Sequence, residues 1–130
     1  MTTDSETKKE LIVLVDDDSF LIEMYMLKFK KSDYEVLSFT NPKECIEKLK
    51  EGLKPDIILF DVVMPGIDGW TFARQIKDQA LAPQAKFIVL SNQGQQEDID
   101  KSKDLNVDGY IIKALSTPSE VVQKVKELIK

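Results

Sequence analysis

Short apolar segments recur five times along the chain, separated by stretches of helical length. Each segment is too short for a helix and most are rich in branched residues, so each predicts a β-strand. The first, third and fourth are continuously apolar, which is typical of parallel strands covered on both faces. The second alternates more and fits the edge of a sheet. The predicted strands cover residues 11–15, 34–39, 56–60, 86–90 and 110–113.

The stretches between these strands have helical patterns. Phe20, Met24 and Leu27 recur at helical spacing and predict a helix with an apolar stripe, the face that such a helix turns to a core. Residues 41–44 (NPKE) and 117–120 (TPSE) both have the order N-cap, proline at N1 and glutamate at N3, which marks a helix start. The remaining two helices are predicted over residues 70–80 and 95–105.

Alternation of five strands with five helices predicts one parallel sheet. Right-handed crossovers place the helices on both faces of such a sheet. We expect an α/β fold with a single domain over residues 11–130 and a disordered N-terminal tail over residues 1–10.

The composition narrows the classes of function. The 130 residues include 18 Lys and Arg, 23 Asp and Glu, one Cys and no His, with a net charge of −5. The acidic balance argues against nucleic-acid binding, because phosphate backbones are held mainly by Lys and Arg. Without His, the chain has no imidazole for a serine-protease triad, a histidine zinc site or a phosphohistidine carrier.

The chain is expected to be cytoplasmic. Residues 1–10 carry no apolar signal core, and no uncharged apolar run approaches the roughly 18 residues that a membrane helix needs. A single Cys cannot form an internal disulfide, which fits a reducing compartment. We therefore expect no membrane partner.

Polar side chains gather where the predicted strands end. In an open parallel sheet, ligands bind outside the carboxyl ends of the strands, so residues at these positions are candidates for a common site. The positions in question follow the first, third, fourth and fifth strands, and they are Asp16, Asp17, Asp18, Asp61, Ser91, Asn92 and Lys113.

Asp16, Asp17 and Asp61 would converge if the first and third strands are neighbours. Carboxylates this close repel by about 4 kcal/mol per pair at an effective dielectric constant near 20. A hard divalent cation with oxygen ligands, such as Mg²⁺, removes this repulsion. The alternative is that Asp17 or Asp18 caps the following helix, and for Asp18 alone we favour that interpretation.

Lys113 and Ser91 complete a set of groups that suits a phosphoryl ligand. An ammonium, a hydroxyl donor and a metal together match about two negative charges. Asp61 is then the expected nucleophile, because carboxylates form acyl phosphates. Taken singly, Lys113 could be a solvated lysine at a strand end and Ser91 a turn residue.

At these residues the sequence resembles the receiver domain of two-component response regulators, in particular single-domain, chemotaxis-regulator-like proteins. The resemblance rests on VDDD (15–18), FDVVMPGIDGW (60–70), VLS ending at Ser91 and DGYIIK ending at Lys113. It implies a receiver domain over residues 11–130. It also implies a flavodoxin-like, doubly wound (βα)5 fold with a five-stranded parallel sheet of order 2-1-3-4-5.

The same resemblance assigns roles to the acidic residues. It implies that Asp61 is the phosphoacceptor. It further implies that Asp17 and Asp61 hold Mg²⁺, with Mn²⁺ as the alternative ion, and that Asp16 contributes partly through water. The backbone carbonyl of Val63 would complete the protein ligands.

Three further residues receive roles from the resemblance. Ser91 and Lys113 stand where the family has its catalytic hydroxyl and lysine. Tyr110 stands where the family has an aromatic residue that changes rotamer as the hydroxyl residue moves, so Ser91 and Tyr110 would form a switch.

Two positions depart from the family pattern. Ala114 replaces the usual proline after the lysine, and Asn92 replaces a small residue after the serine. Because a cis bond costs about 3–4 kcal/mol without proline, we expect a trans peptide bond before Ala114. Asn92 is expected to restrict access to an acyl phosphate.

The resemblance also implies partners. A sensor histidine kinase or a histidine phosphotransfer protein would supply the phosphoryl group, and an unknown downstream protein would receive the signal. The protein would be a phosphoacceptor rather than a classical enzyme, and a monomer or weak homodimer.

Two alternatives stay open. An aspartyl-nucleophile, Mg²⁺-dependent phosphatase would want a second acid at position 63, where the chain has Val63. A receiver-like adaptor that is never phosphorylated would not need Asp17, Asp61, Ser91 and Lys113.

Overall fold

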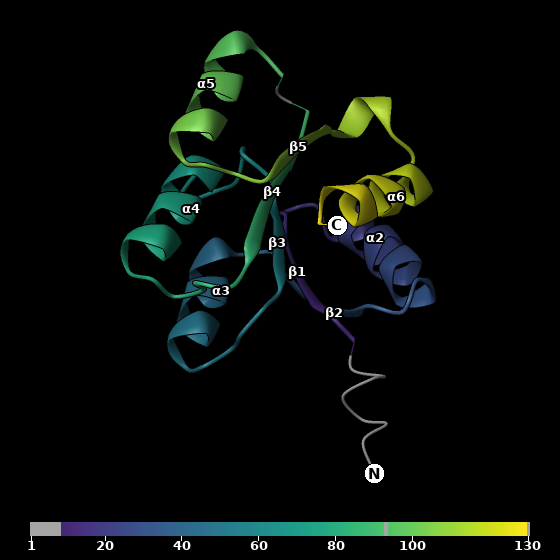
Figure 1. Cartoon of the computed structure of the whole chain (residues 1–130), viewed down its shortest axis with the longest axis horizontal. Coiled ribbons are helices and arrows are strands. Elements are labelled where there is room, and N and C mark those ends of the chain that lie inside the picture. The colour runs from purple at the N-terminus through teal and green to yellow at the C-terminus, as the bar shows by residue number, and fades with distance from the viewer. Residues whose placement is uncertain (1–8, 93, 130) are drawn as a thin grey trace.

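The computed structural model in Figure 1 describes residues 9–92 and 94–129. In this part of the chain, five parallel strands form one sheet of order β2-β1-β3-β4-β5. This flavodoxin-like arrangement confirms the predicted fold class and strand order. The strands are β1 (Leu11–Val15), β2 (Glu35–Phe39), β3 (Ile57–Phe60), β4 (Lys86–Ser91) and β5 (Gly109–Ile112).

Helices cover both faces of the sheet. In Figure 1, α2 and α6 lie on one face, and α3, α4 and α5 lie on the other. A short 3₁₀ helix, η1, connects β5 to α6. The helices are α2 (Ser19–Lys31), α3 (Pro42–Lys50), α4 (Gly69–Asp78), α5 (Gln96–Asp104), η1 (Lys113–Leu115) and α6 (Pro118–Leu128).

The strand pattern sorts the core into two layers. Ile12 and Leu14 of β1 pack on the side of α2 and α6, while Val13 and Val15 pack on the side of α3 and α4. The apolar strands β1, β3 and β4 occupy the interior of the sheet, and β2 is an edge strand, as predicted. Cys45 of α3 is fully buried in the second layer, and burial raises its pKa to about 12.

Side-chain caps fix the helix starts. The Asn41 side chain accepts a hydrogen bond from the Lys43 amide at 2.9 Å. Thr117 and Glu120 form a reciprocal capping box, with distances of 3.2 and 2.8 Å between each side-chain oxygen and the other residue's amide. Both predicted helix starts are therefore confirmed. Asp18 caps α2 by accepting from the Leu21 amide at 3.1 Å, which confirms its capping role.

The apolar stripe predicted for α2 does not face the core. Phe20 and Leu27 are 71% and 55% exposed, and Met24 is 38% exposed. The buried face of α2 instead consists of Ile22, Tyr25 and Phe29. Both sets have helical spacing, so periodicity alone could not choose between them. The second set is buried because that face of α2 packs on α6 and β2.

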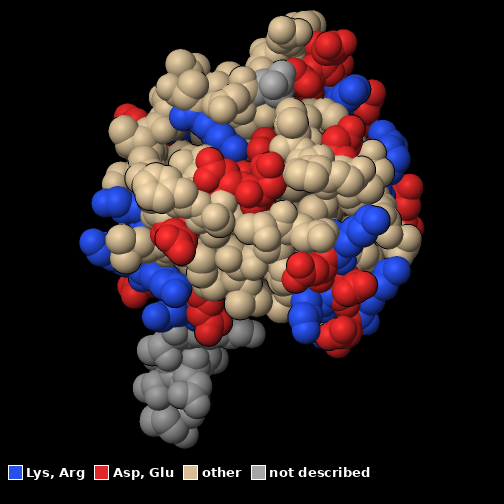
Figure 2. Space-filling view, turned by 180° about the vertical axis from the view of Figure 1, so that it is seen from behind, with Lys and Arg blue, Asp and Glu red and all other residues tan. Residues whose placement is uncertain are grey.

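Residues 1–8 of the predicted tail lie outside the described residues, as does Lys130 at the other end. Lys9 and Glu10 are exposed and belong to no helix or strand. Among the described residues, no helix is long and apolar enough to cross a membrane. On the face shown in Figure 2, acidic and basic side chains are interspersed, without a broad basic area.

Candidate functional site

The predicted acidic residues come together at the carboxyl end of the sheet. β1 and β3 are neighbours with Val15 in register with Phe60, so the next residues, Asp16 and Asp61, lie side by side. Carboxylate oxygens of Asp16, Asp17 and Asp61 all lie within 4.8 Å of one another. Asp16 and Asp61 are buried, whereas Asp17 is exposed. The expected convergence is therefore observed.

Lys113 crosses to these acids from the end of β5. Its Nζ lies 2.6 Å from Asp16 Oδ2 and 3.1 Å from Asp61 Oδ2, and its side chain is mostly buried. Burial by itself lowers the pKa of Lys113, but the hydrogen bonds and charges of the two carboxylates outweigh it and raise the pKa. Lys113 is thus a fixed cation at neutral pH.

Asp16 is the acid that burial affects most clearly. Desolvation raises the pKa of Asp16, and hydrogen bonds from Lys113 and from the Asp18 amide counter only part of that effect. The Asp18 amide donates to Asp16 Oδ1 at 3.0 Å, while Lys113 holds Oδ2. Additional positive charge beside Asp16 would therefore favour its ionised form.

Backbone geometry fixes the rotamer of Asp61. The Val62 amide donates to Asp61 Oδ1 at 2.7 Å, and Lys113 holds Oδ2. The amide of Gly69 donates to the Val62 carbonyl at 2.7 Å. A Cβ on Gly69 would overlap the Asp61 carbonyl oxygen and Val62 Cα, so only glycine permits this close approach of α4.

A pocket of about 250 Å³ lies beside the acids. Asn92, in the position expected to restrict access, is exposed and forms part of its wall. Ser91 ends β4 and is only 1% exposed. The pocket is lined by Asp17, Asp61, Val63, Ser91, Asn92 and Lys113.

Tyr110 is set back from this pocket on β5. It pairs in register with Val89, two residues before Ser91 on β4. Its ring lies 6.4 Å from that of Trp70, with an angle of 42° between the planes. Burial, with smaller contributions from Asp98 and Asp61, raises the pKa of Tyr110 to about 12.

The link between β5 and α6 differs from a proline loop. Among the described residues no peptide bond is cis, so the trans bond expected before Ala114 is confirmed. Residues Lys113–Leu115 form η1, which is closed by the Ser116 amide donating to the Lys113 carbonyl at 3.2 Å.

Two contacts were missed by the sequence analysis, one in the site and one at the start of α4. The ion pair between Lys113 and Asp16 joins residues 97 positions apart, and no local sequence pattern predicts it. Asp68 caps α4 by accepting from the Thr71 amide at 2.8 Å. Here a signal was available, because an aspartate immediately before a helical pattern is a typical N-cap.

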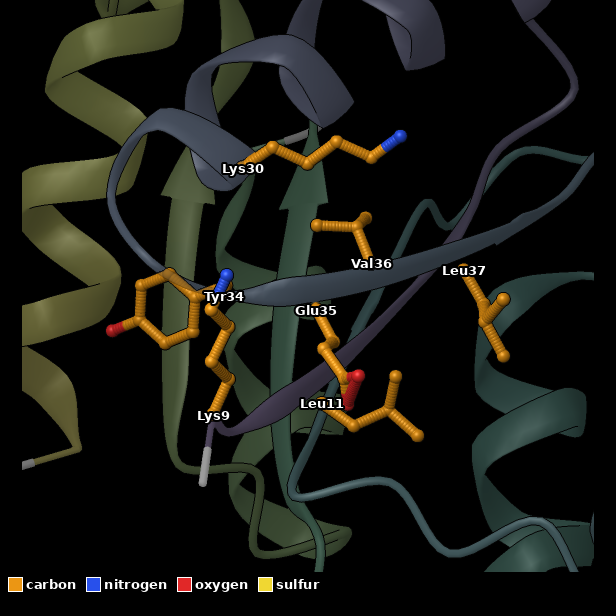
Figure 3. A pocket seen from close by; sticks show the side chains of 7 residues that line it. All are labelled: Lys9, Leu11, Lys30, Tyr34, Glu35, Val36 and Leu37. Atoms are coloured by element: carbon orange, nitrogen blue, oxygen red, sulfur yellow. The ribbon is translucent and has the colours of Figure 1, made fainter. Parts of the chain in front are cut away.

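A second pocket, of about 570 Å³, lies at the opposite end of the strands (Figure 3). Its lining comes from the starts of β1 and β2 and the end of α2, and combines Lys9, Lys30 and Glu35 with apolar side chains such as Leu37. Although this pocket is larger, it does not bring together a set of like ligand groups. The acidic pocket is therefore the candidate functional site.

Comparisons with known proteins identify the family of the chain. The family model of the response regulator receiver domain matches residues 12–126. The chain is 35% identical over 120 residues to the chemotaxis protein CheY of Thermotoga maritima, covering 92% of this chain and 97% of that protein.

Longer regulators are similar over part of their length. The alkaline phosphatase synthesis transcriptional regulatory protein PhoP of Bacillus subtilis is 31% identical over 121 residues, covering 92% of this chain and 48% of PhoP. The chain thus spans about half of that relative.

A solved structure completes the comparison. The response regulator protein TrrA of Thermotoga maritima, in complex with Mg²⁺-BeF, is 28% identical and superposes with a TM-score of 0.77, covering 92% of this chain and 98% of TrrA. With its parallel sheet, its acidic pocket and these matches, the chain belongs to the receiver domain family of two-component response regulators.

Proposed function

We propose that this receiver domain is a phosphorylation switch in which Asp61 accepts a phosphoryl group with the help of Mg²⁺. The observation that carries the proposal is the position of Asp61: one carboxylate oxygen contacts Lys113, and the other acids lie within 4.8 Å. The phosphoryl donor is a phosphohistidine on a sensor histidine kinase or a histidine phosphotransfer protein, since this chain has no His.

The donor set fits a divalent cation. Mg²⁺ prefers oxygen ligands and keeps several waters, and the cluster offers carboxylate oxygens on one exposed and two buried residues. Asp16, Asp17, Asp61 and the backbone carbonyl of Val63 would hold it; Mn²⁺ is the alternative ion. When bound, the cation supplies positive charge beside the oxygens of the transferred group.

The chain's own residues position and stabilise the transfer. A carboxylate oxygen of Asp61 forms a bond to phosphorus while the phosphorus–nitrogen bond of the donor breaks, and the electron pair leaves with the imidazole nitrogen. The Val62 amide holds Asp61 in one rotamer. The Lys113 ammonium stabilises charge on the phosphoryl oxygens, and the Ser91 hydroxyl donates to one of them.

The signal then passes through protein contacts to a downstream partner. Phosphorylation draws Ser91 towards the phosphoryl group, and Tyr110 on the neighbouring strand follows. The protein thus acts as a phosphoacceptor in the cytoplasm rather than as a classical enzyme. The phosphatase alternative is less favoured, because Val63 lines the pocket where that class would place a second acid.

Intact mass spectrometry tests the proposal. The protein is incubated with acetyl phosphate and Mg²⁺, beside an Asp61→Asn variant and a sample with excess chelator. We expect one phosphoryl adduct on the parent and none on the variant or the chelated sample. An adduct on Asp61→Asn, or an unmodified parent under conditions where Mg²⁺ binding is demonstrated, would contradict it.

A further inference from the structure

Trp70 belongs to the core layer that contains Phe60, the residue directly before Asp61. It is the second residue of α4 and is only 6% exposed. Its ring lies 6.5 Å from that of Phe60, nearly perpendicular, and 6.4 Å from that of Tyr110. Phe60 directly precedes Asp61 on β3, so the indole packs between the acceptor strand and Tyr110 on β5.

The indole nitrogen of Trp70 is unusual. Nε1 is buried, and it finds no hydrogen-bond acceptor among residues 9–92 and 94–129. Buried indole N–H groups are normally paired, because an unpaired donor loses its hydrogen bond to water without replacement. A leucine or phenylalanine would fill apolar space without this penalty. The indole therefore points to an acceptor that is in reach in another arrangement of its neighbours.

Tyr110 is the neighbour able to provide such an acceptor. Its ring is only partly buried and packs against the core layer that contains Trp70. Its strand leads directly into Lys113, and it pairs beside the strand that ends in Ser91. A phenol hydroxyl both donates and accepts, so a change in the Tyr110 rotamer can bring an acceptor oxygen towards Nε1.

We propose that Trp70 is a positioning residue for Tyr110: its ring holds Tyr110 in the unmodified protein, and its N–H donates to the Tyr110 hydroxyl once Asp61 is phosphorylated. The inference rests on the proposed function and deepens it, because it names the group that stabilises the signalling position of Tyr110. The hydrogen bond gained on phosphorylation then helps to favour that position.

Fluorescence tests the inference directly, because Trp70 is the only Trp in the sequence. Emission is recorded before and after beryllofluoride and Mg²⁺, for the parent, Tyr110→Phe and Tyr110→Ala. A new indole hydrogen bond shifts the parent emission to longer wavelength. We expect this shift to be lost in Tyr110→Phe, which keeps the ring but has no hydroxyl. An equal shift in parent and Tyr110→Phe would overturn the inference.

Mass spectrometry of the same samples with acetyl phosphate separates the two failures. If the adduct on Asp61 forms but the emission does not change, the inference fails and the proposed function stands. If Asp61 stays unmodified, the proposed function fails, and the inference fails with it.

A second measurement tests the packing in the unmodified protein. Absorbance at 295 nm is recorded during alkaline titration of the protein with and without Tyr110→Phe. Each pair is measured in three backgrounds: the parent Trp70, Trp70→Phe and Trp70→Leu. The difference isolates the Tyr110 phenol, whose pKa is raised by burial and, to a smaller extent, by the charges of Asp98 and Asp61. We expect its pKa to stay near 12 with Phe and to fall towards 10.0 with Leu. An unchanged pKa in Trp70→Leu would contradict the holding role of the ring.

Discussion

At the scale of single residues, Asp16 and Lys113 both have raised pKa values, and the two shifts affect stability over different pH ranges. Its raised pKa means that the folded state holds a proton on Asp16 more tightly than the unfolded state. The stability that this gives is fully present below pH 3.8 and is lost as the pH rises through the raised value. Lys113, also with a raised pKa, stabilises the fold below pH 10.5, and this is lost as the pH rises through its own raised value.

These pKa shifts predict how the stability of a Lys113→Met variant depends on pH. At pH 7.5 the change leaves the buried carboxylates of Asp16 and Asp61 without their cation. We expect the free energy of unfolding to fall by about 3 kcal/mol. This is the lower end of the range for a broken buried ion pair, because the pocket is open to water. Without Lys113 the pKa of Asp16 rises further, so the loss becomes smaller as the pH falls to 5. Urea unfolding at both pH values measures this, with the exposed Lys103→Met as control. A loss that is constant between the two pH values would contradict it.

At the scale of elements, three helices in the described part of the chain are followed by a non-glycine residue in the left-handed region. Asp33, Ala80 and Asn106 have φ of 68°, 51° and 54° after α2, α4 and α5. Aspartate and asparagine tolerate this conformation because their side chains hydrogen-bond locally, whereas alanine has no such compensation. The Leu81 amide still donates to the Ile76 carbonyl at 3.0 Å, which is the hydrogen bond of a Schellman turn.

Ala80→Gly is therefore expected to stabilise the protein. Glycine adopts positive φ without strain, so the gain is about 1 kcal/mol, or roughly 3–5 °C in Tm. Differential scanning calorimetry measures the shift. The matched control is Ala82→Gly, a buried position without positive φ, where the same exchange should lower Tm. An unchanged or lower Tm for Ala80→Gly would show that the turn is not strained.

The positions of some elements could be predicted from local sequence patterns alone, whereas the buried face of α2 could not. Strand positions followed from apolar runs, and the α3 and α6 starts from their caps, because both signals are local. The buried face of α2 did not follow, since Phe20, Met24 and Leu27 have the same period as Ile22, Tyr25 and Phe29. Which face is covered depends on where α6 and β2 lie, and this is a tertiary property.

At the scale of the whole molecule, sheet order decides the site. The acids meet only because β1 and β3 are neighbours. Lys113, at the end of β5, lies two strands along the sheet from β3 and three from β1, yet reaches both Asp61 and Asp16. Periodicity predicted a parallel sheet but not its order, which the family resemblance supplied. The site residues were predictable from their position after strands, whereas the pairing of Lys113 with Asp16 required the folded chain.

Metal binding is expected to couple to global stability. With chelator present, Asp17→Asn removes repulsion among three close carboxylates, and we expect a gain of about 1 kcal/mol because Asp17 is exposed and screened. Added Mg²⁺ should raise the Tm of the parent by mass action and that of the variant much less. Thermal unfolding with a Mg²⁺ titration measures both effects, with the exposed Asp104→Asn as control. Equal Mg²⁺ shifts in parent and Asp17→Asn would exclude Asp17 as a ligand.

The buried thiol of Cys45 has a practical consequence for studying the proposed movements of Ser91 and Tyr110. A fully buried sulfur with a pKa near 12 presents almost no thiolate to alkylating probes while the protein is native. Leu115, in η1 two residues after Lys113, is 73% exposed. A cysteine introduced there would be the only thiol to react with a spin label or dye. The native background needs no cysteine replacement, so site-specific spectroscopy can begin from the unaltered core.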